Sequence, residues 1–219
     1  MNILKPSFMW LGSAPDGLQI LENVVKAGRV CYQSDKEGNE EQFVRNIIKR
    51  GHESVLEHEK ISVVVICDRG VTHEIVRHRI ASYSQESTRY VNYKSGVQYI
   101  DIEGGILRDS KIQKLDDLTI ANIISEWLYA CADAERHYVK IIELGASPQI
   151  ARSVLNNSTK TQIVMTMNLR EWRHFFKLRN DIAAHPQMRE IAEELLAAFK
   201  DVVPVVFDDI PAKGCDPNE

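Results

Sequence analysis

Residues 61–67, a run dominated by β-branched side chains, constrain the fold of this chain more strongly than its composition does. The run is too short for a buried helix of usual length, and β-branched residues favour the pleated surface of a sheet. It therefore predicts a central strand. Residues 68–70 are expected to turn the chain, and the spacing of Val71 and Ile75 then predicts a short helix.

Three further segments predict strands. Residues 159–167 alternate between more apolar and more polar side chains, as expected for an antiparallel strand with one wetter face. Residues 3–12 are mixed apolar and predict an edge strand, and residues 97–102 predict a shorter extended piece. The pair Gly104 and Gly105 is expected to break the chain after it.

Helical spacing of apolar residues recurs in four segments, which are residues 18–28, 40–50, 115–144 and 188–203. Gly28 is expected near the end of the first, and Gly51 and Gly145 stand where C-cap glycines belong. Ser147 and Pro148 suit the start of another helix, which would carry Arg152 one turn inside. The segment 115–144 is the longest, and its apolar surface predicts an oligomer, although the helix could also be core in a monomer.

A further helix is predicted to begin at Asn168, with Glu171 completing a capping-box pattern. On a wheel of about 100° per residue, the polar side holds Arg170, Arg173, His174 and Lys177. The aromatic side holds Trp172, Phe175 and Phe176. Arg179 falls in the middle of that aromatic side, where a charge is costly unless it is paired. Arg179 therefore either meets a ligand group in a pocket of low dielectric or lies past the helix end in solvent.

Positive charge gathers between Arg69 and Lys94. This window holds five arginine or lysine side chains and two glutamates, a net of +3 in a chain whose formal net charge is −4. Guanidinium forks and serine hydroxyls in one loop suit a phosphate group. The window predicts a site for a small anion, although a solvated basic loop would have the same composition. The slightly acidic total argues against a general nucleic-acid coat.

Several familiar site patterns are missing from the sequence. His73 and His78 are five residues apart, so they do not share the helix face that a zinc-binding pair needs. The four cysteines form no Cys-x-x-Cys pair and are expected to be reduced thiols. Ser87 has no nucleophile elbow around it, and no glycine-rich dinucleotide turn occurs. The sequence predicts no metal site, and side chains must hold any dinucleotide.

The chain of 219 residues with 44% hydrophobic content is long enough to bury a core. Residues 1–212 are expected to form one domain, and residues 213–219 a flexible tail. Lys5 and Pro6 interrupt the first apolar residues, and no segment approaches the roughly 20 apolar residues of a membrane span. We expect a cytoplasmic protein without a membrane partner.

The most specific motif is Arg77-His78-Arg79, followed after seven residues by Ser87 and then by Arg89. This pattern resembles the signature of the flavin-dependent thymidylate synthases. The resemblance extends from about residue 29 to residue 187. Four further blocks match in order, namely residues 52–58, Ala151-Arg152, Asn168-x-Arg170 and Leu178-Arg179.

The resemblance implies an α+β fold with a mainly antiparallel sheet flanked by helices and one long central helix. It also implies a homotetramer whose active sites combine residues from several subunits. The implied reaction is reductive methylation of dUMP to dTMP. FAD, reduced by NADPH, would be the hydride carrier, and 5,10-methylenetetrahydrofolate would supply the one-carbon unit. No cysteine needs to attack the uracil in the scheme of this family, and no cysteine lies in the matched basic motifs.

Carried over position by position, the resemblance also assigns residues to ligands. Assigned to FAD are Ser54, Arg77, His78, Arg79, Gln85, Asn168, Arg170 and His174. Assigned to dUMP are Glu74, Arg77, Gln85, Glu86, Ser87, Thr88, Arg89, Arg152 and Arg179. Arg179 matches the arginine that contacts the uracil ring and is the expected catalytic residue, and His52 lies near the folate.

Three positions depart from the family pattern. Glu74 stands where many members have Gln, and a carboxylate there would repel a phosphate unless it is bonded elsewhere or protonated. Cys31 stands where Ser is common. The stretch from Arg179 to His185 is longer than in some members.

Two other functions stay open on the sequence alone. A regulator could bind a nucleotide in the same basic pocket without catalysing a reaction, and such a protein would be colourless after purification. A nucleic-acid binder could use the arginine and tyrosine side chains of the loop, and its affinity would fall steeply with salt.

Overall fold

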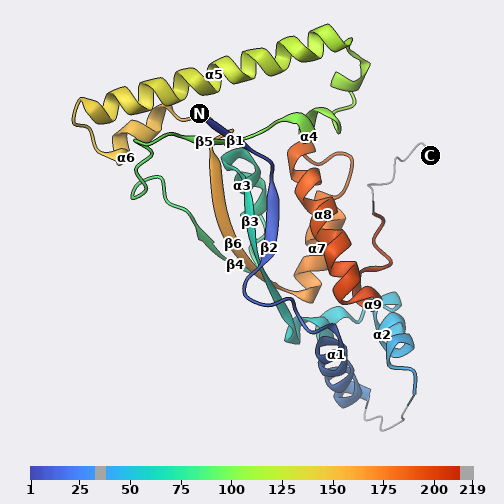
Figure 1. Cartoon of the computed structure of the whole chain (residues 1–219). Helices are drawn as coiled ribbons and strands as arrows, with labels where there is room; N and C mark the ends of the chain where they lie inside the picture. The colour runs from blue at the N-terminus through green and yellow to red at the C-terminus, as the bar shows by residue number, and fades with distance from the viewer. Residues whose placement is uncertain (33–37, 213–219) are drawn as a thin grey trace.

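The computed structural model describes residues 1–32 and 38–212 (Figure 1), so the predicted tail at 213–219 lies outside the described residues. The strands are β1 (Asn2–Leu4), β2 (Ser7–Trp10), β3 (Lys60–Asp68), β4 (Ala81–Gln85), β5 (Gln98–Ile100) and β6 (Lys160–Asn168). The α-helices are α1 (Gly17–Tyr32), α2 (Glu40–Lys49), α3 (Arg69–Ile75), α4 (Glu103–Ile106), α5 (Asp117–Glu143), α6 (Pro148–Ala151), α7 (Leu169–Arg179), α8 (Pro186–Val202) and α9 (Pro204–Phe207). Short 3-10 helices are η1 (Glu53–His58), η2 (Ile112–Lys114) and η3 (Arg152–Val154).

The β-branched run forms β3, which lies inside a four-stranded sheet of order β2-β3-β6-β4. All neighbours in this sheet are antiparallel, and Val64 lies opposite Val164 in the register of β3 and β6. The central strand and the α+β class are therefore confirmed, with β2 at an edge as expected. The strands β1 and β5 form a separate, parallel pair.

The main core lies between one face of the sheet and the helices α7 and α8, which Figure 1 shows beside the sheet. Inward side chains of β3 and β6, such as Val63 and Met165, are fully buried there. They meet aromatic residues of the helices, and the rings of Trp172 and Phe199 lie 4.6 Å apart between centroids. The indole nitrogen of Trp172 also donates to the Ile61 carbonyl at 3.1 Å, which ties α7 to the sheet.

The long helix α5 is present over nearly the predicted range. It runs along one end of the folded molecule and is not central in it (Figure 1). Only Cys131, Ala134 and Tyr138 of this helix are buried, and Cys131 and Tyr138 belong to a small second core. Leu118 and Tyr129 remain 72% and 68% exposed. Among the described helices, none is both long and apolar enough to cross a membrane.

Two glycine predictions are wrong for the same physical reason. The helix α1 continues past Gly28 to Tyr32, and Gly28 lies at a packing contact where an added Cβ would be only 2.8 Å from the ring of Phe43. The pair Gly104 and Gly105 lies inside α4, where an added Cβ would meet side chains of α8. Each glycine permits close packing of two elements and does not end one.

The remaining helix boundaries follow local chemistry. Gly51 and Gly145 have positive φ angles of 73° and 94° just after α2 and α5. The Asp68 carboxylate accepts the Val71 N–H at 2.7 Å, so the turn expected at 68–70 is the first turn of α3. The Asn168 side chain accepts the Glu171 N–H at 2.8 Å, and Asn168 is both the last residue of β6 and the N-cap of α7.

Candidate active site

The strand pairing brings the Arg-His-Arg segment to helix α7. Ala81 at the start of β4 lies opposite Met167, one residue before the cap of α7. The segment that precedes β4 therefore lies against α7, although about 90 residues separate the two along the chain. Glu74 at the end of α3, His78, Glu171 and Arg179 meet at this junction.

Arg179 is the last residue of α7, and its charge is paired. Its Nη1 donates to the Glu74 carboxylate at 2.7 Å, and its Nη2 donates to the Glu74 carbonyl at 2.9 Å. Its Nε donates to His78 Nε2 at 3.1 Å. The side chain is 14% exposed. Arg179 does not lie past the helix end, and the Glu74 carboxylate is bonded to it as the departure from the family pattern required.

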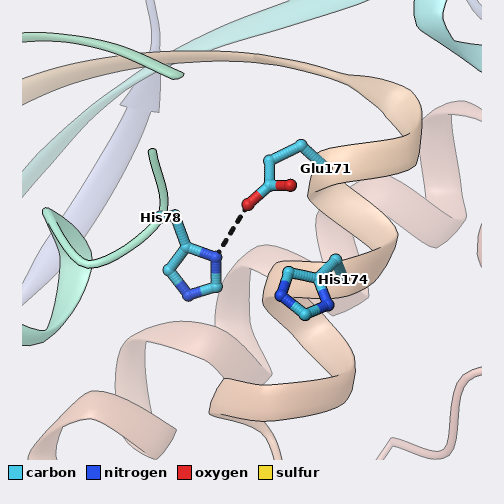
Figure 2. Close-up of side chains that lie close together, drawn as sticks. All are labelled: His78, Glu171 and His174. Atoms are coloured by element: carbon cyan, nitrogen blue, oxygen red, sulfur yellow. Dashed lines mark hydrogen bonds and ion pairs between the residues drawn. The ribbon is translucent and has the colours of Figure 1, made fainter. Parts of the chain in front are cut away.

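His78 is 4% exposed and contacts Arg179 through one ring nitrogen and Glu171 through the other. Figure 2 shows the contact with Glu171. Its Nδ1 lies 3.0 Å from Glu171 Oε1. A guanidinium N–H can only donate, so His78 Nε2 must accept and the ring proton must be on Nδ1, facing the Glu171 carboxylate. Burial lowers the pKa of His78, the bond to Glu171 offsets part of this change, and the charge of Arg179 adds to the lowering. The imidazole is therefore neutral at pH 7.

A cavity of about 450 Å³ adjoins this network. Its lining residues are Glu53, Glu57, Ile80, Asn168, Arg170, Glu171, His174 and Lys177. Three of them, Asn168, Arg170 and His174, are among the residues expected to hold the flavin. Small-molecule sites commonly have volumes of about 300–1,000 Å³. The cavity is lined by polar donors and by three carboxylates, and one of these, Glu171, also contacts His78 of the Arg179 network.

Three other predicted flavin residues, Ser54, Arg77 and Arg79, are exposed and are not among the residues that line this cavity. Arg77 and Arg79 are exposed, and Arg77 Nε donates to the His73 carbonyl at 3.2 Å. Ser54 is exposed on η1, the element that supplies Glu53 and Glu57 to the cavity wall. Arg170 is bonded to Glu57.

His78, Glu171 and His174 also form a group whose possible metal-ligand atoms all lie within 4.8 Å of one another. Spacing along the chain could not reveal this group, because His78 is far from the other two in sequence. Hydrogen bonds to Glu171 and Arg179 engage both ring nitrogens of His78. The geometry therefore favours a hydrogen-bonded network over a metal site.

A second group of predicted residues lies beyond the far end of β4. Arg152 Nη1 donates to the buried Thr88 hydroxyl at 3.1 Å, and Arg89 Nε donates to the Gln149 side chain at 3.2 Å. The Ser87 hydroxyl accepts the Arg89 N–H at 3.3 Å. Two arginines and a serine thus lie in one connected set of contacts here, and these side-chain types suit an anion.

Gln85 and Glu86 are bonded within the protein beside this second group. The Gln85 amide donates to Thr72 and Thr161 at 3.1 and 3.3 Å. Glu86 accepts from Lys160 at 2.8 Å and from the Tyr93 hydroxyl at 2.6 Å. The predicted dUMP residues therefore form two groups, and no hydrogen bond between described residues joins the Arg179 group to the Arg152 group.

The wheel placed Arg173 on one side of α7 with Arg170, His174 and Lys177, and the structure shows that this side is buried at Arg173. Arg173 is 1% exposed. Its guanidinium donates to both carboxylate oxygens of Asp209 at 2.6 and 2.7 Å, and to Glu53 at 3.2 Å. The chain after α9 folds back over α7 and covers the arginine. Periodicity within one helix contains no signal of such a distant partner.

The cysteines lie outside both groups of site residues. Cys31 is an exposed free thiol, whereas Cys67 and Cys131 are buried free thiols. Burial raises the pKa of Cys67, and the nearby charge of Asp68 raises it further. Burial also raises the pKa of Cys131. The two buried thiols are therefore poor nucleophiles at neutral pH. Cys215 lies outside the described residues.

Comparison with known proteins identifies the family. A family model described as "Thymidylate synthase complementing protein" matches residues 18–205. A flavin-dependent thymidylate synthase of Mycobacterium avium (strain 104) is 35% identical, over 94% of this chain and 85% of the relative. One of Mycobacterium tuberculosis (strain ATCC 25618 / H37Rv) is 36% identical with the same coverage.

A solved structure supports the fold independently. The UMP/dUMP methylase PolB from Streptomyces cacaoi, bound with 5-Br dUMP, matches with a TM-score of 0.80 at 24% identity, over 98% of both chains. The sequence motifs, the family model and the mycobacterial relatives agree with this likeness. The chain belongs to the flavin-dependent thymidylate synthase family.

Proposed function

We propose that this chain catalyses the reductive methylation of dUMP to dTMP in the cytoplasm. FAD reduced by NADPH would be its hydride carrier, and 5,10-methylenetetrahydrofolate would be its one-carbon donor. The observation that carries the proposal is the half-buried Arg179, held by Glu74 and His78 in a network that reaches the cavity through Glu171. Membership of the family supports the reaction class.

The residues present fit a flavin. Asn168, Arg170 and His174 line the cavity with amide, guanidinium and imidazole groups, which suit ring carbonyls, ring nitrogens and phosphates. Arg77 and Arg79 are exposed, with Arg79 next to Ile80 of the cavity wall, and they would neutralise the pyrophosphate together with Ser54 on η1. Gln85 lies at the far end of β4 with the second group and would join this set from a second copy. Bound FAD would supply the hydride that the product methyl group requires.

Arg152, Arg89 and Ser87 would hold the dUMP phosphate through charge-assisted bonds, with Glu86 and Thr88 shaping the loop. Arg179 would face the uracil ring after exchanging Glu74 for the nucleotide. Its fixed positive charge in a partly buried site would favour negative charge as it develops on the ring. His52 would lie toward the folate. No enzyme cysteine is required.

We also propose a homotetramer with shared sites. Two features support it: the exposed apolar residues of α5, and the division of the dUMP residues into two groups within one chain. A second copy that brings its Arg152 group to the Arg179 group of the first would complete the substrate site. Sedimentation of the active holoenzyme should therefore show no active monomer.

The test is the absorption spectrum of the purified protein, followed by NADPH with and without dUMP. We expect a yellow protein whose flavin bleaches faster with dUMP, and dTMP after addition of methylenetetrahydrofolate. A colourless protein that binds dUMP would indicate the regulator instead. Binding of oligonucleotides with steep salt dependence, and no dTMP, would indicate the nucleic-acid binder.

A further inference from the structure

We infer that Glu171 is a positioning residue that fixes the His78 proton on Nδ1 and so holds Arg179 in orientation from the wall of the cavity. The consequence for turnover rests on the proposed function of Arg179. The hydrogen-bond geometry does not, and it can be tested separately. Neither the family pattern nor the sequence motifs assign a role to Glu171 beyond the first turn of α7.

Glu171 has the position that such a role requires. It is 8% exposed, it lines the cavity, and its backbone is anchored because the Asn168 cap accepts its N–H. Its carboxylate does not return to the cap as a capping box would have it, and lies 3.0 Å from His78 Nδ1. The ring of Phe175 packs 5.0 Å from the His78 ring and limits its rotation.

The choice of tautomer follows from the partners on both sides of the ring. A neutral imidazole has one donor and one acceptor nitrogen. Arg179 presents an N–H to Nε2, so this nitrogen must accept. A carboxylate at Nδ1 can only accept, which places the proton there. An amide in the position of Glu171 can either accept from Nδ1–H or donate to Nδ1, so it removes the restriction that the carboxylate adds to that of Arg179. When it donates, the proton moves to Nε2 and Nε2–H opposes the Arg179 N–H.

The bond from Arg179 to His78 matters most when substrate binds. Two of the three hydrogen bonds of Arg179 go to Glu74, whose side chain is 38% exposed. The outer edge of the guanidinium must leave Glu74 before it can bind a substrate oxygen. The Nε bond to His78 can persist during this exchange. This bond would keep the plane of the Arg179 guanidinium in the orientation that the substrate needs. A small error in the orientation of a catalytic group can lower the rate by a large factor.

The direct test is side-chain 15N NMR of the histidines in the FAD-loaded enzyme at pH 8. The His78 signals are assigned by their loss in His78→Asn. We expect wild-type His78 to be protonated on Nδ1 alone. In Glu171→Gln we expect the Nε2-protonated form to appear. A wild-type proton on Nε2 would overturn the inference, and so would an unchanged tautomer in Glu171→Gln.

Kinetics provide the second readout. Glu171→Gln should lower kcat for dTMP about tenfold to a hundredfold, with a smaller change in the KM for dUMP. NADPH-dependent flavin reduction should stay near the wild-type rate. The matched control is Glu57→Gln, which removes one charge from the same cavity without touching His78, and it should keep the wild-type tautomer.

The outcomes separate the inference from the proposed function. Loss of flavin and turnover together in Glu171→Gln, with the His78 tautomer unchanged, would make Glu171 a cavity residue only. Wild-type protein that forms no dTMP would overturn the proposed function, and the tautomer measurement would still decide the role of Glu171.

Discussion

Two regions of helix α7 each bury an arginine, and they differ in what their partners can do. Around Arg173, Asp209 and Glu53 hold the guanidinium, and the Val206 carbonyl accepts as well. Around Arg179, one half-exposed glutamate takes both outer nitrogens, and the network borders a cavity. The first arrangement fixes the chain after α9 to the helix. The second can exchange a partner, which is what a ligand site needs.

The comparison predicts its largest effect at Arg179. Arg179→Ala should lower dTMP formation by roughly 100- to 1,000-fold, because a charge aimed at the developing negative ring is removed. Thermal stability should change little, and NADPH should still reduce the flavin. Arg179→Lys should restore little activity, since an ammonium lacks the planar fork. A lower Tm with near-normal specific activity would make Arg179 structural, like Arg173.

Arg173 should show the opposite pattern. Arg173→Met should lower the free energy of unfolding by about 2–3 kcal/mol, because Asp209 and Glu53 lose their common partner. The dTMP activity per folded molecule should stay near wild type. Urea unfolding followed by fluorescence measures the first quantity. Lys177→Ala, which removes an exposed cation 4.0 Å from Glu53, is the control and should change stability far less. Loss of activity without loss of stability would break the comparison.

The exposed arginines Arg77 and Arg79 should be replaceable without loss of the fold, but not without loss of flavin binding. Arg77→Ala or Arg79→Ala should weaken FAD binding about tenfold or more, since each removes a charge from the proposed pyrophosphate contact. The fold should be preserved, because both side chains are exposed. The ratio of flavin absorbance to protein after dialysis measures the effect. A variant that stays as yellow as wild type would exclude that arginine.

A carboxyl whose pKa is raised by burial and one whose pKa is lowered by an arginine should respond oppositely to pH. Burial raises the pKa of Glu190 to about 7, with Arg108 offsetting part of the change. Its folded pKa lies above its unfolded pKa of about 4.3, so the stability it contributes is present below that value and is lost as pH rises through 7. Glu190→Gln should therefore raise Tm at pH 8, and the difference should shrink at pH 5.

Asp209 gives the contrasting case. The hydrogen bond from Arg173 lowers its pKa. Its stabilisation is present above the unfolded pKa of about 3.9 and is lost as pH falls below it. Asp209→Asn should therefore lower Tm at pH 7, and this difference should shrink below pH 4. Thermal unfolding of Glu190→Gln and Asp209→Asn from acid to alkaline pH measures both changes in Tm. Changes of the same sign at neutral to alkaline pH would contradict this contrast.

Sequence patterns identified those features of the fold that are determined within a single helix or strand. The β-branched run gave β3, the helical spacing gave α5, and the cap at Asn168 gave the start of α7. The contact of Glu171 with His78 and that of Arg173 with Asp209 were not visible, because each joins segments that only the folded topology brings together. Gly28 was misread because its neighbour Phe43 lies on another helix.

Strand β6 passes directly into helix α7 through Asn168, so the chain cannot accept insertions or deletions at this junction. Each residue inserted at this junction would rotate the whole of α7 by about 100° and advance it by about 1.5 Å. Arg179 would then leave its partners even if every side chain were kept. Insertions after Arg179, in the segment before α8, carry no such penalty. Variation in length among relatives should therefore be found downstream of α7 and avoided at its start.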